Sequence, residues 1–432
     1  MKKTSFTTLI VILSVHFALS SEKIPTPLEL SEYNELTSHV KMMEYLRMID
    51  RKARHLSMEI IGESVLSRDI PALFFSAEHP FVANLEDKPT VLIYCQQHGN
   101  EPSGKEAALE LAGELAAGNK NRFRNFNLIL IPMVNPDGAE TQDRENAGGM
   151  DLNRDHAALD QPETQALHSL FYKYMPEVAL DVHEYNAVSK KWVENGYIKN
   201  ADEMIGAVTN LNIDAEIAAF SRKVIILETG SLIINAGYTF HRYVVGQPFE
   251  DERMRYSTTA VNDGRQSMGI YNTFSFILEG KKYKGLLTDL EKRTKAQMTA
   301  MNSFIDVISS HAEEIKTISA KSRQNLLDPE GSANDLVHLQ MDYFPADEET
   351  NIQFPVFDLY EWAPDTLRIE NFHPVVKAKK SVPKPHGYVF PGNFSGLKAL
   401  LRKHHIEMYE LAGKSDLKIE AYTVVNLTEQ IE

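Results

Sequence analysis

The sequence predicts an α/β fold in which helices flank a central mixed, mostly parallel sheet, followed by a smaller C-terminal α+β or β-rich domain. Helix-like and strand-like patterns alternate between residues 28 and 320, which is typical of layered α/β domains. The run Thr90–Cys95 is nearly all apolar or aromatic, as expected of a strand that is covered on both faces. From about residue 326 the chain turns to Asp, Pro, Gly and Ser, with short strand-like runs between prolines.

The elements of the main domain follow from the spacing of apolar residues. Ser31 can cap a first helix whose apolar positions Leu36, Val40, Met43 and Leu46 fall on one face. The elements predicted after it are strands at residues 57–61, 70–76 and 90–95, a helix at 103–117, a strand at 127–133, a helix at 162–174, and strands at 178–182 and 273–278. The last strand follows a long polar loop, and a helical pattern covers residues 286–319.

The C-terminal hundred residues contain strand-like runs at 337–343, 388–390 and 419–425, and one helix at 396–404. We therefore place a domain boundary near residue 325, which leaves a main domain at 21–325 and an accessory domain at 326–432. No motif in this accessory domain indicates its chemistry.

Composition excludes several classes of protein. The 432 residues include 60 Asp and Glu against 45 Lys and Arg, a formal net charge of −15. This charge argues against a nucleic-acid binder, whose affinity would come from neutralising phosphates. The single cysteine, Cys95, excludes an internal disulfide framework and any multi-cysteine metal site. Histidine and carboxylate side chains remain as metal ligands.

The N-terminus reads as a cleaved export signal at residues 1–20. Lys2 and Lys3 precede an apolar run at residues 9–19, and small residues follow where a signal peptidase cleaves. The run is too short to span a bilayer, which takes about 20 residues, and no other stretch is long and apolar enough. A buried N-terminal helix is the alternative. We expect an exported protein, either periplasmic or extracellular, with no membrane span.

Polar side chains gather where the predicted strands end. The turn after Thr90–Cys95 carries His98 and Glu101, which can aim at one point, and Pro102 suits the first position of the next helix. This pattern is weak alone, but further polar residues follow the later strands. They are Asn135-Pro136-Asp137-Gly138, Arg144, Asp151, Asn153, Arg154, His183 and Glu279.

This ordered series resembles the zinc carboxypeptidase family, the carboxypeptidase A-like enzymes. The matching elements span about residues 30–285, and each lies at the predicted end of a strand or in the loop after it. The series forms six motifs, which are His98 with Glu101, Asn135 to Gly138, Arg144, Asp151 to Arg154, His183 and Glu279. Each motif is unspecific by itself, whereas all six in the order that the family has are a strong signal. The resemblance implies a carboxypeptidase-like catalytic domain for residues 21–325.

The resemblance also implies a cofactor, one Zn²⁺ per chain. His98, Glu101 and His183 would bind this ion and leave one position for water. Asp151 would accept a hydrogen bond from a ring N–H of His98 and so orient the ring.

The same resemblance implies the roles of four further residues. Glu279 would act as general base toward a zinc-activated water, and Arg144 would help to stabilise the oxyanion. Asn153 and Arg154 would hold the terminal carboxylate of the substrate, which restricts cleavage to a chain end. The expected function is therefore an exported zinc metallocarboxypeptidase that hydrolyses the C-terminal amide bond of peptides.

Two alternatives stay open. One is a zinc amidase or deacylase of the same superfamily that acts on cell-wall peptides or N-acyl amino acids. The other is an inactive relative that binds peptides. The family's tyrosine that caps the bound carboxylate has no clear counterpart, and Tyr256 and Tyr271 are both candidates.

Overall fold

The computed structural model describes residues 23–78, 81, 87–249, 252–327, 336–348, 351–411 and 419–420. The predicted export signal lies outside the described residues, as do all but the first two residues of the predicted strand at 419–425. Backbone contacts divide the chain into two compact units, Met1–Val389 and Phe390–Glu432. The sheet and the candidate site belong to the first unit, and the second contains α12 (Ser395–Lys403), where the sequence predicts a helix.

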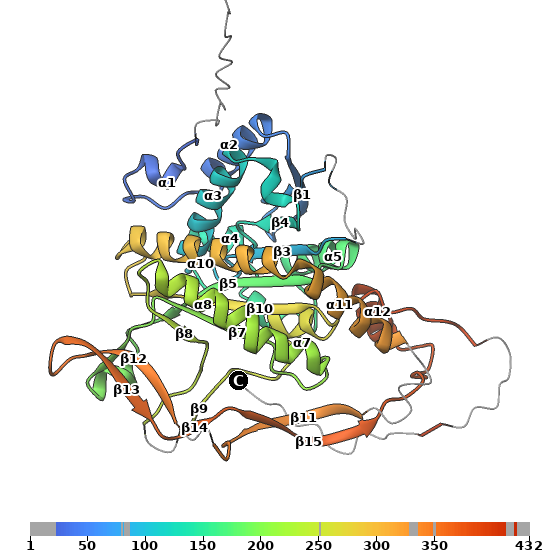
Figure 1. Ribbon diagram of the computed structural model, residues 1–432. Helices are drawn as coiled ribbons and strands as arrows, with labels where there is room; N and C mark the ends of the chain where they lie inside the picture. Colours follow the sequence, from blue (N-terminus) through green and yellow to red (C-terminus); the bar gives the residue numbers. More distant parts are fainter. Residues whose placement is uncertain are drawn as a thin grey trace, which may run out of the picture. The chain divides into compact units, whose positions relative to one another are not determined.

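An eight-stranded sheet with the order β1-β2-β4-β3-β5-β10-β7-β8 forms the framework of the first unit (Figure 1). Its strands are β1 Leu56–Glu63, β2 Asp69–Phe75, β3 Thr90–Cys95, β4 Asn127–Ile131, β5 Val178–Asn186, β7 Glu203–Ala207, β8 Phe240–Arg242 and β10 Phe274–Lys282. The neighbours β4, β3, β5 and β10 run parallel to one another. Antiparallel pairs join β1 to β2, β2 to β4 and β7 to β10. The predicted mixed, mostly parallel sheet is confirmed.

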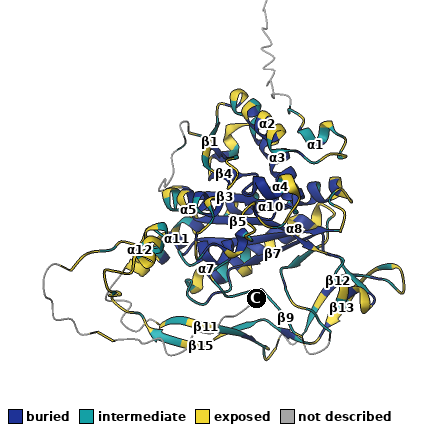
Figure 2. Ribbon diagram, turned by 180° about the vertical axis from the view of Figure 1, so that it is seen from behind, coloured by how far each residue is buried: buried dark blue, intermediate teal, exposed yellow. Residues whose placement is uncertain are grey.

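Helices cover both faces of this sheet, because successive side chains of each central strand point to opposite faces. The long helices are α2 His39–Lys52, α3 Pro102–Ala117, α5 Pro162–Tyr174, α8 Ile226–Asn235, α10 Leu290–Ser310 and α11 Ala312–Leu327. In β3, Ile93 packs into a core shared with α2, α3, α8 and α10, whereas Leu92 packs into a core shared with α5. Figure 2 shows the central strands in the dark blue of buried residues.

The first predicted helix is wrong at its start. Ser31 ends the short helix α1 (Pro27–Leu30), and α2 begins only after Ser38, whose hydroxyl accepts a hydrogen bond from the Lys41 amide. The chain between them turns at residues 31–35, and the amide and hydroxyl of Thr37 then both donate to Glu106 of α3. Val40 is consequently 65% exposed, although the sequence pattern places it on the apolar face.

The predicted long polar loop before β10 is also wrong. Residues 187–272 include α6 Lys190–Glu194, β6 Tyr197–Lys199, β7, α7 Ala215–Phe220, the π-helical turn η3 Ser221–Ile225, α8, β8, β9 Met254–Arg255 and α9 Gly264–Gly269. Within β7, Glu203 and Gly206 interrupt the apolar residues, so the strand lacks a continuous apolar run. It forms through pairing with β10, where Gly206 lies opposite Ile277.

The remaining short elements lie in the connections between strands. They are η1 Lys120–Phe123, α4 Pro136–Thr141 and η2 Leu152–Arg154. The predicted helical region at 286–319 is divided into α10 and α11, which meet at His311.

Small β sheets follow the main domain, as predicted. Their strands are β11 Leu336–Phe344, β12 Ile352–Asp358, β13 Ala363–Ile369, β14 Phe372–His373 and β15 Val375–Pro383. β11 pairs with β15, β12 pairs with both β13 and β6, and β14 pairs with β9. The predicted strand at 388–390 is wrong, because these residues pair with no strand in the described part of the chain and the side chain of Tyr388 is 81% exposed.

The β12–β14 region completes a third hydrophobic cluster of the first unit. Phe354, Val356, Ile369 and Phe372 pack there against residues of the main domain such as Trp192, Met204 and Met254. The domain boundary near residue 325 stays a prediction, since residues 328–335 lie outside the described part of the chain. Within the described part, no helix is both long enough and apolar enough to cross a membrane.

Candidate metal centre and active site

The candidate site lies at the carboxyl ends of three neighbouring parallel strands, where ligands gather in open α/β sheets. β3 leads into the loop that carries His98 and Glu101. β5 carries His183, and β10 carries Glu279 directly beside it in register. Chain segments far apart in the sequence thus place four predicted site residues at one sheet edge.

Backbone contacts hold the loop after β3 in place. Glu101 is the N-cap residue of α3, and Pro102 is its first residue, the position for which this proline is suited. A Cβ atom on Gly99 would lie 1.9 Å from the carbonyl carbon of Gly138, so only glycine permits this approach of the two loops. The Asn135 side chain also donates to the carbonyl of Gln97 over 3.0 Å.

His98, Glu101 and His183 converge in a buried cluster. The Nδ1 atoms of the two histidines lie 3.1 Å apart. Glu101 faces both rings, with Oε1 3.0 Å from the His98 Nδ1 and Oε2 3.1 Å from the His183 Nδ1. The three side chains are 2–5% exposed.

The other nitrogen of each ring is held by an aspartate. His98 Nε2 lies 3.0 Å from Asp151 Oδ1, and His183 Nε2 lies 2.8 Å from Asp181 Oδ1. Burial opposes ionisation of Asp151, but its hydrogen bond and attraction to His98 outweigh that effect and leave its pKa below the ordinary value. A ring that donates its Nε2–H to the aspartate keeps its Nδ1 lone pair available to the cluster.

This donor set fits a zinc ion. Two Nδ1 lone pairs that face each other at 3.1 Å repel unless a proton or a cation lies between them. A carboxylate next to two neutral imidazoles is a ligand set found in catalytic zinc sites, and carboxylates commonly orient such histidines from behind. The cluster therefore has both the ligand atoms and the supporting hydrogen bonds that zinc requires.

Glu279 lies beside this cluster and is 7% exposed. Burial raises the pKa of Glu279 to about 7, and the charge of Glu101 acts in the same direction. The Tyr243 hydroxyl donates a hydrogen bond to Glu279, which lowers the pKa of that carboxyl. Burial likewise holds the pKa of the Tyr243 phenol well above its usual value. Tyr243 therefore stays a neutral donor to the carboxylate.

The residues predicted to stabilise an oxyanion or to hold the substrate carboxylate lie close to the ligand cluster. Arg144 Nε donates to Asp151 Oδ2 over 3.0 Å, and its Nη1 lies 3.2 Å from His98 Nδ1. Asn153 accepts a hydrogen bond from the Gly264 amide, and its own amide nitrogen lies 3.2 Å from His183 Nε2. Arg154 Nη1 donates to the Asn153 carbonyl over 2.8 Å.

A cavity of about 460 Å³ connects these groups. Its lining includes seven of the eight residues that the sequence predicts: His98, Glu101, Arg144, Asn153, Arg154, His183 and Glu279. The eighth, Asp151, lies behind His98 and Arg144. The structure thus brings the whole predicted set together.

Arg265 also lines this cavity and is 1% exposed. Its Nη2 bonds to Ser257 and Asp263, whereas its Nε and Nη1 have no hydrogen-bond partner in the described part of the chain. The attraction of Asp263 raises the pKa of the Arg265 guanidinium, even though burial opposes its charge. A buried cation with two unpartnered donor atoms therefore lies in the wall of the cavity that Glu279 also lines.

The two tyrosines considered as caps lie elsewhere. The Tyr271 hydroxyl bonds to that of Tyr172, and its ring packs on Phe171. Tyr256 lines a different cavity. The tyrosines that line the site cavity are Tyr185 and Tyr243.

Sequence reasoning overlooked Asp181, Tyr243 and Arg265. Asp181 had a usable signal, because residues two apart on a strand point to the same face and His183 follows it on β5. Tyr243 follows β8 in the stretch read as a polar loop, and Arg265 stands in a short helix without a motif. No local pattern indicated either residue.

Comparisons with known proteins agree with this site. Residues 42–212 match the zinc carboxypeptidase family, a span that holds the three candidate ligands but ends before Glu279. Carboxypeptidase 2 of Trichophyton rubrum is 26% identical over 396 residues, which cover 90% of this chain and 72% of that protein. Probable carboxypeptidase 2 of Arthroderma benhamiae is 28% identical over 254 residues, which cover 57% of this chain and 48% of that protein.

The fold is similar to the crystal structure of carboxypeptidase A from Helicoverpa armigera. The TM-score is 0.50 at 14% identity, over 65% of this chain and 75% of that one, a likeness of fold alone. Sheet and cluster together define a metallohydrolase with a His, Glu, His metal site. The predicted likeness to the zinc carboxypeptidase family is confirmed by the match of residues 42–212, and this span carries an intact His, Glu, His ligand triad.

Proposed function

We propose that the protein is an exported zinc metallocarboxypeptidase that removes residues from the carboxyl end of peptides, with one zinc ion per chain. One observation carries this proposal: the ligand triad, a buried carboxylate and two arginines line a single cavity. Export rests on the pattern of residues 1–20. The N-terminal sequence of the protein recovered outside the cytoplasm would test it.

His98, Glu101 and His183 would hold the metal through two Nδ1 atoms and a carboxylate. When bound, zinc would act as a Lewis acid and lower the pKa of a water molecule. Asp151 and Asp181 keep the histidine rings oriented for this task. Their role follows from the 3.0 Å and 2.8 Å contacts to the ring nitrogens.

Glu279 would be the general base and later the general acid. Its carboxylate accepts a proton from the attacking water as the new C–O bond forms. It returns this proton to the amide nitrogen as the C–N bond breaks, so that the amine leaves neutral. The hydrogen bond from Tyr243 keeps the carboxylate in one orientation through both transfers.

The arginines would select a chain end and stabilise the developing charge. Arg154 offers a planar guanidinium that suits the terminal carboxylate, and Asn153 lies next to it. Arg144 lies beside the ligand cluster, where an oxyanion would form, and a donor so placed commonly contributes about 3–4 kcal/mol to catalysis. An internal peptide bond presents no such carboxylate.

A digest of a mixed peptide library, read by mass spectrometry, tests the function. We expect loss of single residues from the carboxyl end, and resistance of the same peptides when their C-termini are amidated. Equal cleavage of both sets would contradict the carboxylate clamp. Hydrolysis of N-acyl amino acids or cell-wall peptides alone would indicate the amidase or deacylase. Tight binding without any hydrolysis would indicate the inactive relative.

A further inference from the structure

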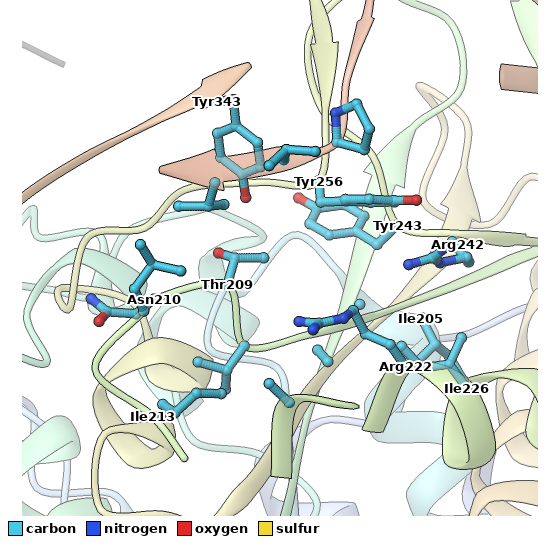
Figure 3. A pocket seen from close by; sticks show the side chains of 18 of the residues that line it. Ile205, Thr209, Asn210, Ile213, Arg222, Ile226, Arg242, Tyr243, Tyr256 and Tyr343 are labelled. Atoms are coloured by element: carbon cyan, nitrogen blue, oxygen red, sulfur yellow. The ribbon is translucent and has the colours of Figure 1, made fainter. Parts of the chain in front are cut away.

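A second cavity, also of about 460 Å³, lies beside the catalytic cavity, and Tyr243 lines both. One side is formed by the end of β7 and by α7, η3 and α8. The other side is formed by Tyr343 of β11 and by residues 374–376 at the start of β15. Figure 3 shows this cavity from close by. It contains none of the zinc ligands and not Glu279.

Two arginines, Arg222 of η3 and Arg242 of β8, supply all the formal charge of this lining. No Asp or Glu lines the cavity. Neither arginine forms an ion pair with another described residue, and Arg242 Nε is buried without a hydrogen-bond partner. The cavity therefore holds two cations whose charge the surrounding side chains do not neutralise.

The two guanidinium groups lie close enough to repel. Arg222 is partly exposed, but loss of solvent around the part of it that lines the cavity lowers its pKa, and the charge of Arg242 lowers it further. Figure 3 shows the Arg242 guanidinium beside the tyrosine rings and the Arg222 guanidinium below them in the same cavity. Holding two like charges at one cavity is unfavourable unless an anion compensates them.

The rest of the lining suits an apolar or aromatic body. Ile205, Ile213 and Ile226 lie on the side of β7 and the helices, and tyrosine rings lie on the other. The Arg242 guanidinium lies 4.4 Å from the centroid of the Tyr256 ring, a stacking that orients its planar donors. The volume falls in the range of about 300–1,000 Å³ that is typical of small-molecule sites.

We propose that this cavity binds a small organic dianion with an aromatic or apolar body, whose two anionic groups are held by Arg222 and Arg242. A dianion would neutralise both cations at once, and its body would cover the isoleucine and tyrosine side chains. The proposal does not depend on the peptidase function.

Isothermal titration calorimetry with isophthalate, a flat aromatic dicarboxylate, tests the proposal on the full chain. Isophthalamide has the same ring without charge, and inorganic phosphate has the charge without the ring. We expect binding of isophthalate at least tenfold tighter than that of either control. Equal binding of phosphate and isophthalate would overturn the assignment of an organic ligand.

Variants locate the binding site. Arg222→Met and Arg242→Met should each weaken isophthalate binding at least tenfold, whereas Arg51→Met, which removes an exposed charge from α2, should not. Arg154→Met reports on the catalytic cavity and should leave isophthalate binding within twofold of the wild type. If Arg154→Met abolishes the binding while the Arg222 and Arg242 variants retain it, the ligand occupies the catalytic cavity and the proposal fails.

Thermal unfolding checks that each variant is folded. Arg222 is exposed to solvent, so its replacement should leave the core intact. Arg222→Lys keeps the charge but loses the planar fork, and we expect it to bind isophthalate with an intermediate affinity. Wild-type affinity in both Arg222 variants would overturn the role of this residue.

Discussion

At the scale of single residues, Glu279 joins the ligand cluster to the substrate cavity. It lies in register beside His183, and its carboxylate accepts the hydrogen bond from Tyr243. Replacement of Glu279 by Gln keeps the shape of the side chain but removes the basic oxygen. We therefore expect turnover to fall about 10²–10⁴-fold, the usual contribution of a general base, which corresponds to about 3–5 kcal/mol. Zinc should stay near one per chain by elemental analysis. Turnover close to that of the wild type would exclude Glu279 as the base.

Replacing a metal ligand should lower zinc affinity much more than replacing the aspartate that orients it. His183→Ala removes a direct ligand, and we expect the purified variant to contain almost no zinc. Asp181→Asn leaves the ligand but weakens its orientation, which typically costs about 10–100-fold in metal affinity. Competition with a chelator measures both variants, and His55→Ala is a control histidine outside the cluster. Full zinc occupancy in His183→Ala would refute the third ligand.

Arg265 predicts a preference among C-terminal residues. Arg265 lines the cavity, and its Nε and Nη1 are buried without hydrogen-bond partners among the described residues. An acidic substrate side chain that reached this guanidinium would supply the missing acceptors. Charged hydrogen bonds contribute about 1.5–3 kcal/mol, so we expect kcat/KM for peptides ending in Glu to exceed that for Gln by at least tenfold.

The variant that tests this preference must not leave Asp263 buried and unpaired, because a broken buried ion pair costs about 3–5 kcal/mol of stability. We therefore suggest the double variant Asp263→Asn/Arg265→Met. Its preference for Glu over Gln should disappear, whereas cleavage of Leu-ended peptides should persist. A wild-type preference in the double variant would exclude Arg265 as its cause.

The predictability of the site depended on whether a residue followed a readable strand. His98, His183 and Glu279 follow or lie in strands with strong apolar runs, so their placement at one sheet edge was predictable. Tyr243 and Arg265 reach the cavity from a segment whose elements form only through tertiary contacts. The spacing of residues along the sequence does not reveal which distant segments pack against the cavity.

Among the elements, strand β7 carries a buried carboxylic acid, Glu203, whose oxygens have no hydrogen-bond partner in the described part of the chain. Burial raises the pKa of this carboxyl well above the ordinary value. The folded protein therefore binds more protons than the unfolded chain above pH 4.5, the ordinary pKa of a glutamate side chain. Hence this residue makes the free energy of unfolding fall as pH rises, by up to about 1.4 kcal/mol per pH unit.

Glu203→Gln should remove that dependence. We expect the variant to be more stable than the wild type at pH 8, and the difference between them to shrink toward pH 4.5. Urea unfolding across this pH range measures the effect, and Glu59→Gln on the exposed part of β1 is the control. A difference that does not change with pH would show that Glu203 is ionised in the folded protein.

Elements with strong local signals were predicted to within a few residues. The bounds of α5 match the prediction, and α3 begins one residue earlier, at Pro102. The start of α2 was missed because Thr37 bonds to Glu106, which lies far away in the sequence. β7 was missed because its pairing with β10, rather than its own composition, makes it a strand.

At the scale of the whole molecule, the chain should tolerate truncation after Val389 but not at residue 325. The shorter chain would lack Phe354, Val356, Ile369 and Phe372, each no more than 1% exposed. Each such side chain contributes about 1.5–3 kcal/mol, so their sum is comparable to a typical net stability of about 5–15 kcal/mol.

Expression of the two truncated chains tests this prediction. We expect residues 21–389 to be soluble and to unfold cooperatively, and residues 21–325 to aggregate. Yield, thermal unfolding and peptidase activity are the measurements. A soluble, active 21–325 chain would instead support the predicted domain boundary near residue 325.

The third hydrophobic cluster also bears on how the protein is made. Tyr185 and Tyr243, which line the catalytic cavity, pack in the same cluster as Phe372. A ribosome delivers the chain from its N-terminus, so the zinc ligands emerge long before Phe372 does. A nascent chain would therefore contain its metal ligands before Phe372, which supports the cavity-lining tyrosines, has been synthesised. Peptidase activity should then appear only near the end of synthesis, which limits premature proteolysis by an incomplete enzyme.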